Sequence, residues 1–253
     1  MSHHITEAAN ASYSYPDGTV GIKNISFKIT HGESVALVGA NGAGKSTLLL
    51  HLNGYLSPAK GEIKIGDFPI TSKNLKDVRK TVGMVFQYPD DQLFMPTVLE
   101  DVAFGPLNLG LSDEQALKKA IDALKIVGAE HLSDRPPYKL SGGEKRSAAI
   151  AAVLAMSPNI LVMDEPASNL DPGSRRRLIN LLKTFKHTKI IATHDLDMAL
   201  ELCERTIILC KGEIKADGET VKLFKDDNLI NQSGLEKPLS MQGCPICGKK
   251  PCP

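Results

Sequence analysis

Residues 39–47 read Gly39-Ala40-Asn41-Gly42-Ala43-Gly44-Lys45-Ser46-Thr47, a complete GxxxxGK[ST] motif. An apolar run, Ser34–Val38, precedes it and the leucine-rich segment Thr47–Leu52 follows it, which predicts a strand, a loop and a helix in that order. Backbone N–H groups of such a loop bind phosphate oxygens, and the N-terminus of the following helix adds a favourable dipole. Lys45 would reach the β- and γ-phosphates, and Ser46 would bind Mg²⁺. We therefore predict that the whole motif binds a nucleotide.

Composition narrows the class of protein. The 253 residues can form one large core with an inserted subdomain, or two small domains. The 30 Lys and Arg residues are balanced by 29 Asp and Glu residues, so the net charge is only +1. A chain with so little net positive charge does not attract nucleic acid through its overall electrostatic field. No apolar run reaches the roughly 18 to 20 residues that span a bilayer, and the N-terminus does not resemble a signal peptide. These features predict a soluble cytoplasmic protein, with Cys203 and Cys210 as reduced core thiols.

Short β-rich runs alternate with helical patterns, which is typical of a mostly parallel sheet covered by helices. The predicted strands are Ile22–Ile29, Ser34–Val38, Glu62–Ile65, Val82–Phe86, Ile160–Met163, Lys189–Thr193, Thr206–Cys210 and Glu213–Asp217. The last two are joined at Lys211-Gly212 and predict an antiparallel hairpin.

The strand signal disappears between residues 89 and 156. Apolar residues at helical spacing predict helices over Asp113–Val127 and Glu144–Met156, so this region should be a helical insertion. From residue 231 the composition shifts to Asn, Gln, Ser and Gly and then to Pro, Cys and Gly. We expect a domain over residues 1–230 and a flexible, Cys-containing C-terminal tail over 231–253.

Two further strands end in chemically active side chains. Ile160–Met163 leads into Asp164 and Glu165, the pattern of a buried strand that delivers acids to its carboxyl end. Asp164 would hold Mg²⁺, and Glu165 would accept a proton from the attacking water. His194 follows another such strand, where it could contact the γ-phosphate or serve only a structural role.

The class is decided by Leu140-Ser141-Gly142-Gly143-Glu144, a second glycine-rich segment that opens a helix and lacks a lysine. It resembles the LSGGQ signature of ATP-binding-cassette (ABC) ATPases, with Glu144 in place of the usual Gln. From about Ile5 to Leu229 the other motifs follow in that family's order. Tyr15 matches the aromatic residue that stacks on adenine, although Tyr13 is close by. Gln87 matches the Q-loop, Asp164 and Glu165 the Walker B pair, Asp171 the D-loop, and His194 the switch histidine.

The resemblance implies an α/β fold: a P-loop NTPase (RecA-like) core with an inserted α-helical signature subdomain, about residues 89–156, and an antiparallel β subdomain. It implies ATP and Mg²⁺ as cofactors, with Mg²⁺ held through Ser46, Gln87 and Asp164. It also implies a head-to-tail dimer of ATPase subunits, here a homodimer, in which Ser141, Gly142, Gly143 and Glu144 act on the ATP of the partner. Besides Glu144, the chain departs from the family at Ser147 and Ala148, where an arginine and a valine are usual.

A finer resemblance lies just after the Q-loop, in residues 87–94 and 97–111 together with Tyr15–Gly18. These segments look like the ATPase subunits of energy-coupling-factor importers, most closely those for cobalt and nickel. This implies transmembrane partner subunits and a peripheral position on the cytoplasmic face of the membrane, reached through those proteins and without nucleic acid. An ATPase for another cargo, such as a vitamin, is the alternative. A soluble ABC ATPase acting on nucleic acid is the third possibility, although the long coiled-coil insertions typical of that class are missing.

The C-terminal cysteines suggest a separate hypothesis. Cys244, Cys247 and Cys252 resemble part of a zinc ribbon, but a closed tetrahedral site needs a fourth ligand. The alternative is a tail with free thiols.

Overall fold

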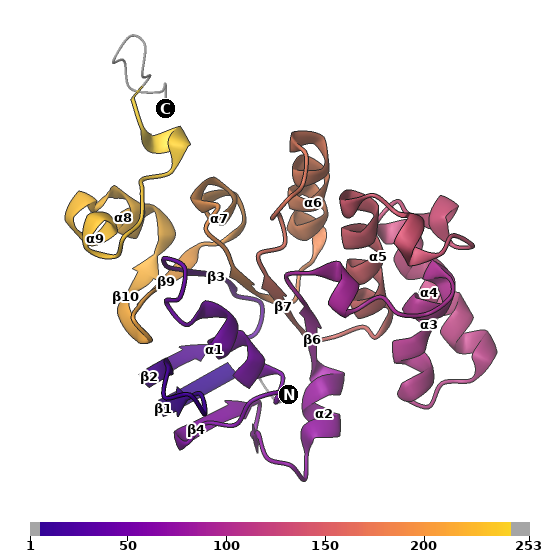
Figure 1. The fold of residues 1–253 in the computed structure, drawn as a ribbon, viewed down its shortest axis with the longest axis horizontal. Coiled ribbons are helices and arrows are strands. Elements are labelled where there is room, and N and C mark those ends of the chain that lie inside the picture. Colours follow the sequence, from indigo (N-terminus) through magenta and orange to yellow (C-terminus); the bar gives the residue numbers. More distant parts are fainter. Residues whose placement is uncertain (1–5, 244–253) are drawn as a thin grey trace.

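The computed structural model describes residues 6–243, which form two β-sheets with helices around them (Figure 1). The larger sheet has six strands in the order β10-β9-β3-β8-β7-β6. Its members are β3 (Ser34–Val38), β6 (Val82–Val85), β7 (Ile160–Asp164), β8 (Thr188–Ala192), β9 (Arg205–Cys210) and β10 (Glu213–Glu219). All neighbours are parallel except β9 and β10, which form the predicted antiparallel hairpin. The carboxyl ends of the parallel strands therefore meet at one edge.

A second, antiparallel sheet has the order β2-β1-β4-β5. It comprises β1 (Thr6–Ser14), β2 (Val20–Ile29), β4 (Lys60–Ile65) and β5 (Phe68–Pro69). Strand β1 has no counterpart among the predicted strands, because its sequence is rich in Ala, Asn and Ser. Pairing on both sides holds it in place: β1 registers with β2 and with β4, and apolar residues of this sheet join the core beneath the larger sheet.

The helical insertion occupies one end of the molecule (Figure 1). It contains α3 (Val98–Asn108), α4 (Asp113–Ile126), α5 (Gly142–Ala155) and three short 3₁₀ turns, η1 (Pro89–Asp91), η2 (Glu130–Leu132) and η3 (Pro137–Lys139). Each of the three long helices begins with a capping box, in which an N-terminal Thr or Ser exchanges hydrogen bonds with a Glu or Gln three residues later. Their buried faces are rich in alanine, so the helices pack closely in a small core of their own.

Other helices cover the two faces of the larger sheet. These are α1 (Lys45–Leu52), α2 (Leu75–Thr81), α6 (Pro172–Thr184), α7 (Leu196–Leu202), α8 (Thr220–Lys225) and α9 (Asp227–Gln232). Leu48 and Leu49 of α1 join the core shared with the antiparallel sheet, whereas Ile179 of α6 and Met198 of α7 lie in the core on the other face. None of the helices in residues 6–243 has both the length and the apolar character needed to cross a bilayer.

The expected flexible tail is wrong for residues 231–243. Helix α9 extends to Gln232, and the chain then continues to the 3₁₀ turn η4 (Leu239–Met241). Leu235 and Met241 pack against the core that contains Ile179 and Met198, and the N–H groups of Leu239 and Ser240 donate to Asp197, each over 3.0 Å. The sequence did not reveal this packing, because Leu235 and Met241 are isolated apolar residues in a segment whose composition is typical of a loop. Of the two predicted core thiols, Cys203 is buried and Cys210 is half-buried.

Candidate active site

The GxxxxGK[ST] loop connects β3 to α1, as the sequence predicts. Gly44 has a φ of 103°, a left-handed conformation that favours glycine, and a Cβ there would collide with the carbonyl oxygen of Gly21. A Cβ at Gly39 would likewise collide with the carbonyl oxygen of Leu209. The loop is thus fixed between β2 and the end of β9, with the N-terminus of α1 behind it.

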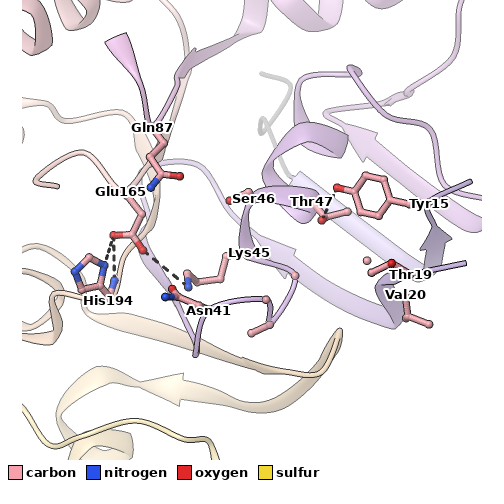
Figure 2. A pocket seen from close by; sticks show the side chains of 14 residues that line it. Tyr15, Thr19, Val20, Asn41, Lys45, Ser46, Thr47, Gln87, Glu165 and His194 are labelled. Atoms are coloured by element: carbon pink, nitrogen blue, oxygen red, sulfur yellow. Dashed lines mark hydrogen bonds and ion pairs between the residues drawn. The ribbon is translucent and has the colours of Figure 1, made fainter. Parts of the chain in front are cut away.

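A cavity of about 520 Å³ lies over this loop, a size that suits a small ligand (Figure 2). Its lining contains the predicted Tyr15, Gln87, Glu165 and His194 together with most of the loop, namely Asn41, Gly42, Ala43, Gly44, Lys45, Ser46 and Thr47. Sequence reasoning missed Thr19, Val20 and Gly21, which line the same cavity. Their signal was weak, since only their position just after the Tyr15–Gly18 turn could have indicated them.

Lys45 lies at the floor of the cavity with 7% of its surface exposed. Its Nζ donates to the carbonyl oxygens of Gly39, over 2.8 Å, and Ala40, over 3.3 Å. The same atom lies 3.9 Å from Oε1 of Glu165. The Lys45 ammonium group has several partners, so it can turn toward an anionic ligand and still keep some of them.

Asp164 ends β7 and is buried. Burial raises its pKa, although a hydrogen bond with Ser46 and the charges of Lys45 and Arg146 act in the opposite direction. Its Oδ1 is buried and has no hydrogen-bond partner. A buried carboxylate oxygen that lacks a partner, beside a serine hydroxyl, is a set of donors that fits a hard cation such as Mg²⁺.

Glu165 and His194 meet at the carboxyl ends of β7 and β8 (Figure 2). His194 Nδ1 lies 2.8 Å from Glu165 Oε2, and the His194 backbone N–H donates to the same oxygen over 3.2 Å. Glu165 has a φ of 46° and its N–H donates to the Ala192 carbonyl oxygen over 2.8 Å. This unusual backbone conformation aims the carboxylate into the cavity, toward Lys45.

Tyr15 lies at the opposite end of the cavity, directly after β1 rather than before the first strand. Its hydroxyl is 2.9 Å from Oγ1 of Thr47, and its ring packs edge-on against Tyr13 at 5.2 Å. Tyr15 lines the cavity and Tyr13 does not. Of these two neighbouring tyrosines, Tyr15 is therefore the one that could contact an adenine ring in the cavity.

The signature residues lie elsewhere. Ser141, Gly142, Gly143 and Glu144 line a second, open hollow of about 1030 Å³, together with Asp171, and none of these five residues lines the cavity over the phosphate loop. Ser141 and Gly142 are exposed. Two halves of the predicted site are thus presented on separate surfaces of one chain.

Arg146 is a site residue that sequence reasoning missed. It is 3% exposed, and its guanidinium donates to the carbonyl oxygens of Phe86, over 2.7 Å, and Gln87, over 2.6 Å. It therefore joins the signature helix α5 to the Q-loop. The sequence shows Ser147 where the family usually has an arginine, and the structure shows that Arg146, one position earlier, is the buried cation.

Within residues 6–243 no group of three or more His, Cys, Asp or Glu side chains is arranged to hold a metal ion. Cys244, Cys247 and Cys252, the hypothetical zinc ligands, lie outside the described residues.

Comparison with known proteins identifies the family. The sequence profile described as "ABC transporter" matches residues 22–168. A putative ABC transporter ATP-binding protein of Geobacter sulfurreducens is 62% identical, covering 98% of this chain and all of the relative. The energy-coupling factor transporter ATP-binding protein EcfA of Methanocaldococcus jannaschii is 46% identical, covering 98% of this chain and 90% of the relative.

Solved structures agree with the fold and with the antiparallel β subdomain. The cbiO1 protein of Clostridium perfringens, described as part of the ABC transporter complex cbiONQ, is 38% identical with a TM-score of 0.79, covering 91% of this chain and 94% of that one. A dimeric bacterial ABC transporter cassette is 30% identical with a TM-score of 0.77, covering 85% and 98%. The chain belongs to the ABC transporter ATPases and is an ATP-binding subunit of the energy-coupling-factor type.

Proposed function

We propose that this ATPase powers an energy-coupling-factor importer for cobalt or nickel ions from the cytoplasmic face of the membrane. The observation that carries the proposal is the cavity in which the phosphate loop, Glu165 and His194 meet, next to a Q-loop surface that exposes aromatic side chains. The first feature supports hydrolysis of ATP. The second supports coupling to a protein partner.

For catalysis, the loop N–H groups and Lys45 bind the phosphates, and Tyr15 packs against the base. Ser46, Gln87 and Asp164 would hold Mg²⁺, which would supply positive charge to neutralise the phosphates. Glu165 accepts the proton of the attacking water. His194 supports that role because its ring N–H, donated over 2.8 Å, orients the Glu165 carboxylate.

The signature completes this site in trans. Ser141, Gly142 and the half-buried Gly143 line an open hollow that is separate from the phosphate-loop cavity. Two chains placed head to tail would set the signature of each against the ATP of the other, with Asp171 beside the contact. One of the similar structures is a dimeric cassette, which supports a dimer. ATP would hold the dimer together, and hydrolysis would release it.

The partner surface lies beside the Q-loop. Tyr88, Phe94, Phe104 and Leu107 are exposed, and the rings of Phe94 and Phe104 pack edge-on at 4.9 Å. Exposed apolar residues gathered in this way are typical of a protein interaction surface. The transmembrane subunits of the importer are the proposed occupants, and the cargo rests on the resemblance of residues 87–111 to cobalt and nickel importers.

Uptake measurements in cells test the proposal. Deletion of the gene should abolish the high-affinity uptake of Co²⁺ or Ni²⁺, and the wild-type gene should restore it. Restoration should fail with Phe94→Ala combined with Phe104→Ala, while ATP binding by that variant stays unchanged. Leu93 is unsuitable for this test because it is buried in the helical core. Normal metal uptake in the deletion strain, with a loss of vitamin uptake instead, would favour the alternative cargo.

A further inference from the structure

Within the signature of this chain, the Glu144 carboxylate is hydrogen-bonded to Ser141. Glu144 Oε2 accepts the backbone N–H of Ser141 over 2.8 Å and the Ser141 hydroxyl over 2.7 Å. In return, the Glu144 backbone N–H donates to Ser141 Oγ over 3.4 Å. Both residues therefore satisfy each other within the first turn of α5.

The direction of these hydrogen bonds decides whether the Ser141 hydroxyl can donate to a phosphate oxygen. An ionised carboxylate only accepts hydrogen bonds, so the single hydroxyl hydrogen of Ser141 must point toward Glu144. A hydrogen bond to an ionised acceptor is about twice as strong as one between neutral groups. The Ser141 hydroxyl is thus unavailable as a donor to a phosphate oxygen, which could still be bound by the N–H groups of Gly142 and Gly143.

Glu144 also places a negative charge beside this surface. The N–H and hydroxyl of Ser141 lower the pKa of Glu144, and nearby Arg135 and His131 add to that effect, so the side chain is ionised at neutral pH. Arg135 Nη1 lies 3.9 Å from the other carboxylate oxygen and only partly offsets the charge, because about half of the Arg135 side chain is in solvent.

We infer that Glu144 weakens the ATP-bound dimer, because it withholds the Ser141 hydroxyl from the γ-phosphate of the partner's ATP and repels that phosphate. The inference rests on the proposed head-to-tail dimer. It identifies Glu144 as a residue that sets the affinity of the dimer without being a catalytic residue. A glutamine at this position would keep the capping box, carry no charge, and hold the hydroxyl less strongly.

The test compares dimer dissociation constants in Mg-ATP by analytical ultracentrifugation, with Glu165→Gln in every protein to prevent hydrolysis. Glu144→Gln should tighten the dimer by about tenfold per site, and so by about 100-fold for a homodimer with two sites. Glu130→Gln is the matched control. Glu130 lies in the same subdomain and pairs with Lys125 at 3.8 Å, so its loss removes equal charge without touching Ser141.

A second substitution separates the hydrogen bond from the charge. Ser141→Ala should change the dissociation constant less than about threefold when Glu144 is present, but should weaken the dimer about tenfold in the Glu144→Gln background. Thermal melting of each variant checks that α5 is intact without its N-terminal hydroxyl.

The outcomes distinguish the inference from the proposed function. Equal dissociation constants with and without the Glu144→Gln substitution, or an equal gain from Glu130→Gln, would overturn the inference while leaving the dimer in place. An effect of Ser141→Ala that is the same in both backgrounds would overturn the hydrogen-bond part. If no variant forms an ATP-dependent dimer, the proposed dimer itself is contradicted, and the inference falls with it.

Discussion

Glu165 is the residue on which hydrolysis should depend most. Its carboxylate faces the phosphate loop and is oriented by His194 over 2.8 Å. Glu165→Gln should keep Mg-ATP binding but slow hydrolysis by about 10²–10⁴-fold, the usual contribution of a positioned base. Steady-state phosphate release and equilibrium nucleotide binding measure the two effects separately. Lys45→Ala is the contrasting variant, in which nucleotide binding itself should weaken. A Glu165→Gln enzyme that hydrolyses ATP near the wild-type rate would remove Glu165 from this role.

Asp195, next to His194, should make stability depend on pH. Burial alone would raise the pKa of Asp195, but hydrogen bonds from the Arg175 guanidinium and the Met198 N–H outweigh it, so the pKa is lowered. A lowered folded-state pKa stabilises the fold above the unfolded-state value near 3.8, and this contribution is lost as pH falls through the folded-state pKa. Asp195→Asn should therefore cost about 1–2 kcal/mol at pH 7 through the lost charge opposite Arg175, because asparagine caps a helix about as well as aspartate.

Urea unfolding of both proteins between pH 7 and pH 3 measures this effect. The difference in unfolding free energy should be constant down to about pH 4.5 and should shrink below it. A difference that stays constant over the whole range would mean that the Asp195 carboxylate charge is not what stabilises the start of α7.

At the scale of elements, Arg146 fastens helix α5 to the end of β6. Replacing it with Met would leave the carbonyl oxygens of Phe86 and Gln87 without their buried donor. Each of these two losses costs about 1–3 kcal/mol, so Arg146→Met should lower the unfolding free energy by about 2–6 kcal/mol in chemical denaturation. Lys145→Met is the matched control, because the ion pair of Lys145 is with an exposed carboxylate, that of Asp90, and is worth about 1 kcal/mol or less. Equal losses of unfolding free energy in the two variants would show that the Arg146 hydrogen bonds to Phe86 and Gln87 contribute no more than the Lys145 ion pair.

The elements also show what the sequence could predict. The phosphate loop, β7 and the β9–β10 hairpin depend on local chemistry, namely glycine positions, an apolar run and a two-residue turn, and the structure has all three as predicted. Strand β1 and the Arg146 contacts depend on partners far away in the chain. Neither alternating small residues nor a lone arginine in a helix reveals such partners, so these features required the fold.

For the whole molecule, the C-terminal segment links distant parts. Gly234 packs beside Ala40 of the phosphate loop, a Cβ at Gly234 being only 3.7 Å from the Ala40 Cβ, while Leu239 and Ser240 donate to Asp197 on α7. The same segment therefore contacts both the loop that binds phosphate and the helix that follows His194. Residues 233–243 are part of the domain that carries the site.

Truncation tests this placement. Removing residues 233–253 exposes the surface that Leu235 and Met241 cover and frees the Asp197 carboxylate, which should cost about 2–4 kcal/mol. For a domain of this size the melting temperature should fall by roughly 5–10 °C, with a parallel loss of ATPase activity. Removing residues 244–253 alone is the control and should change neither. If both truncated proteins melt and hydrolyse ATP like the full chain, the segment does not stabilise the phosphate loop. If the shorter truncation already lowers both, the cysteine-containing end takes part in the domain, and zinc analysis of the full chain becomes the next measurement.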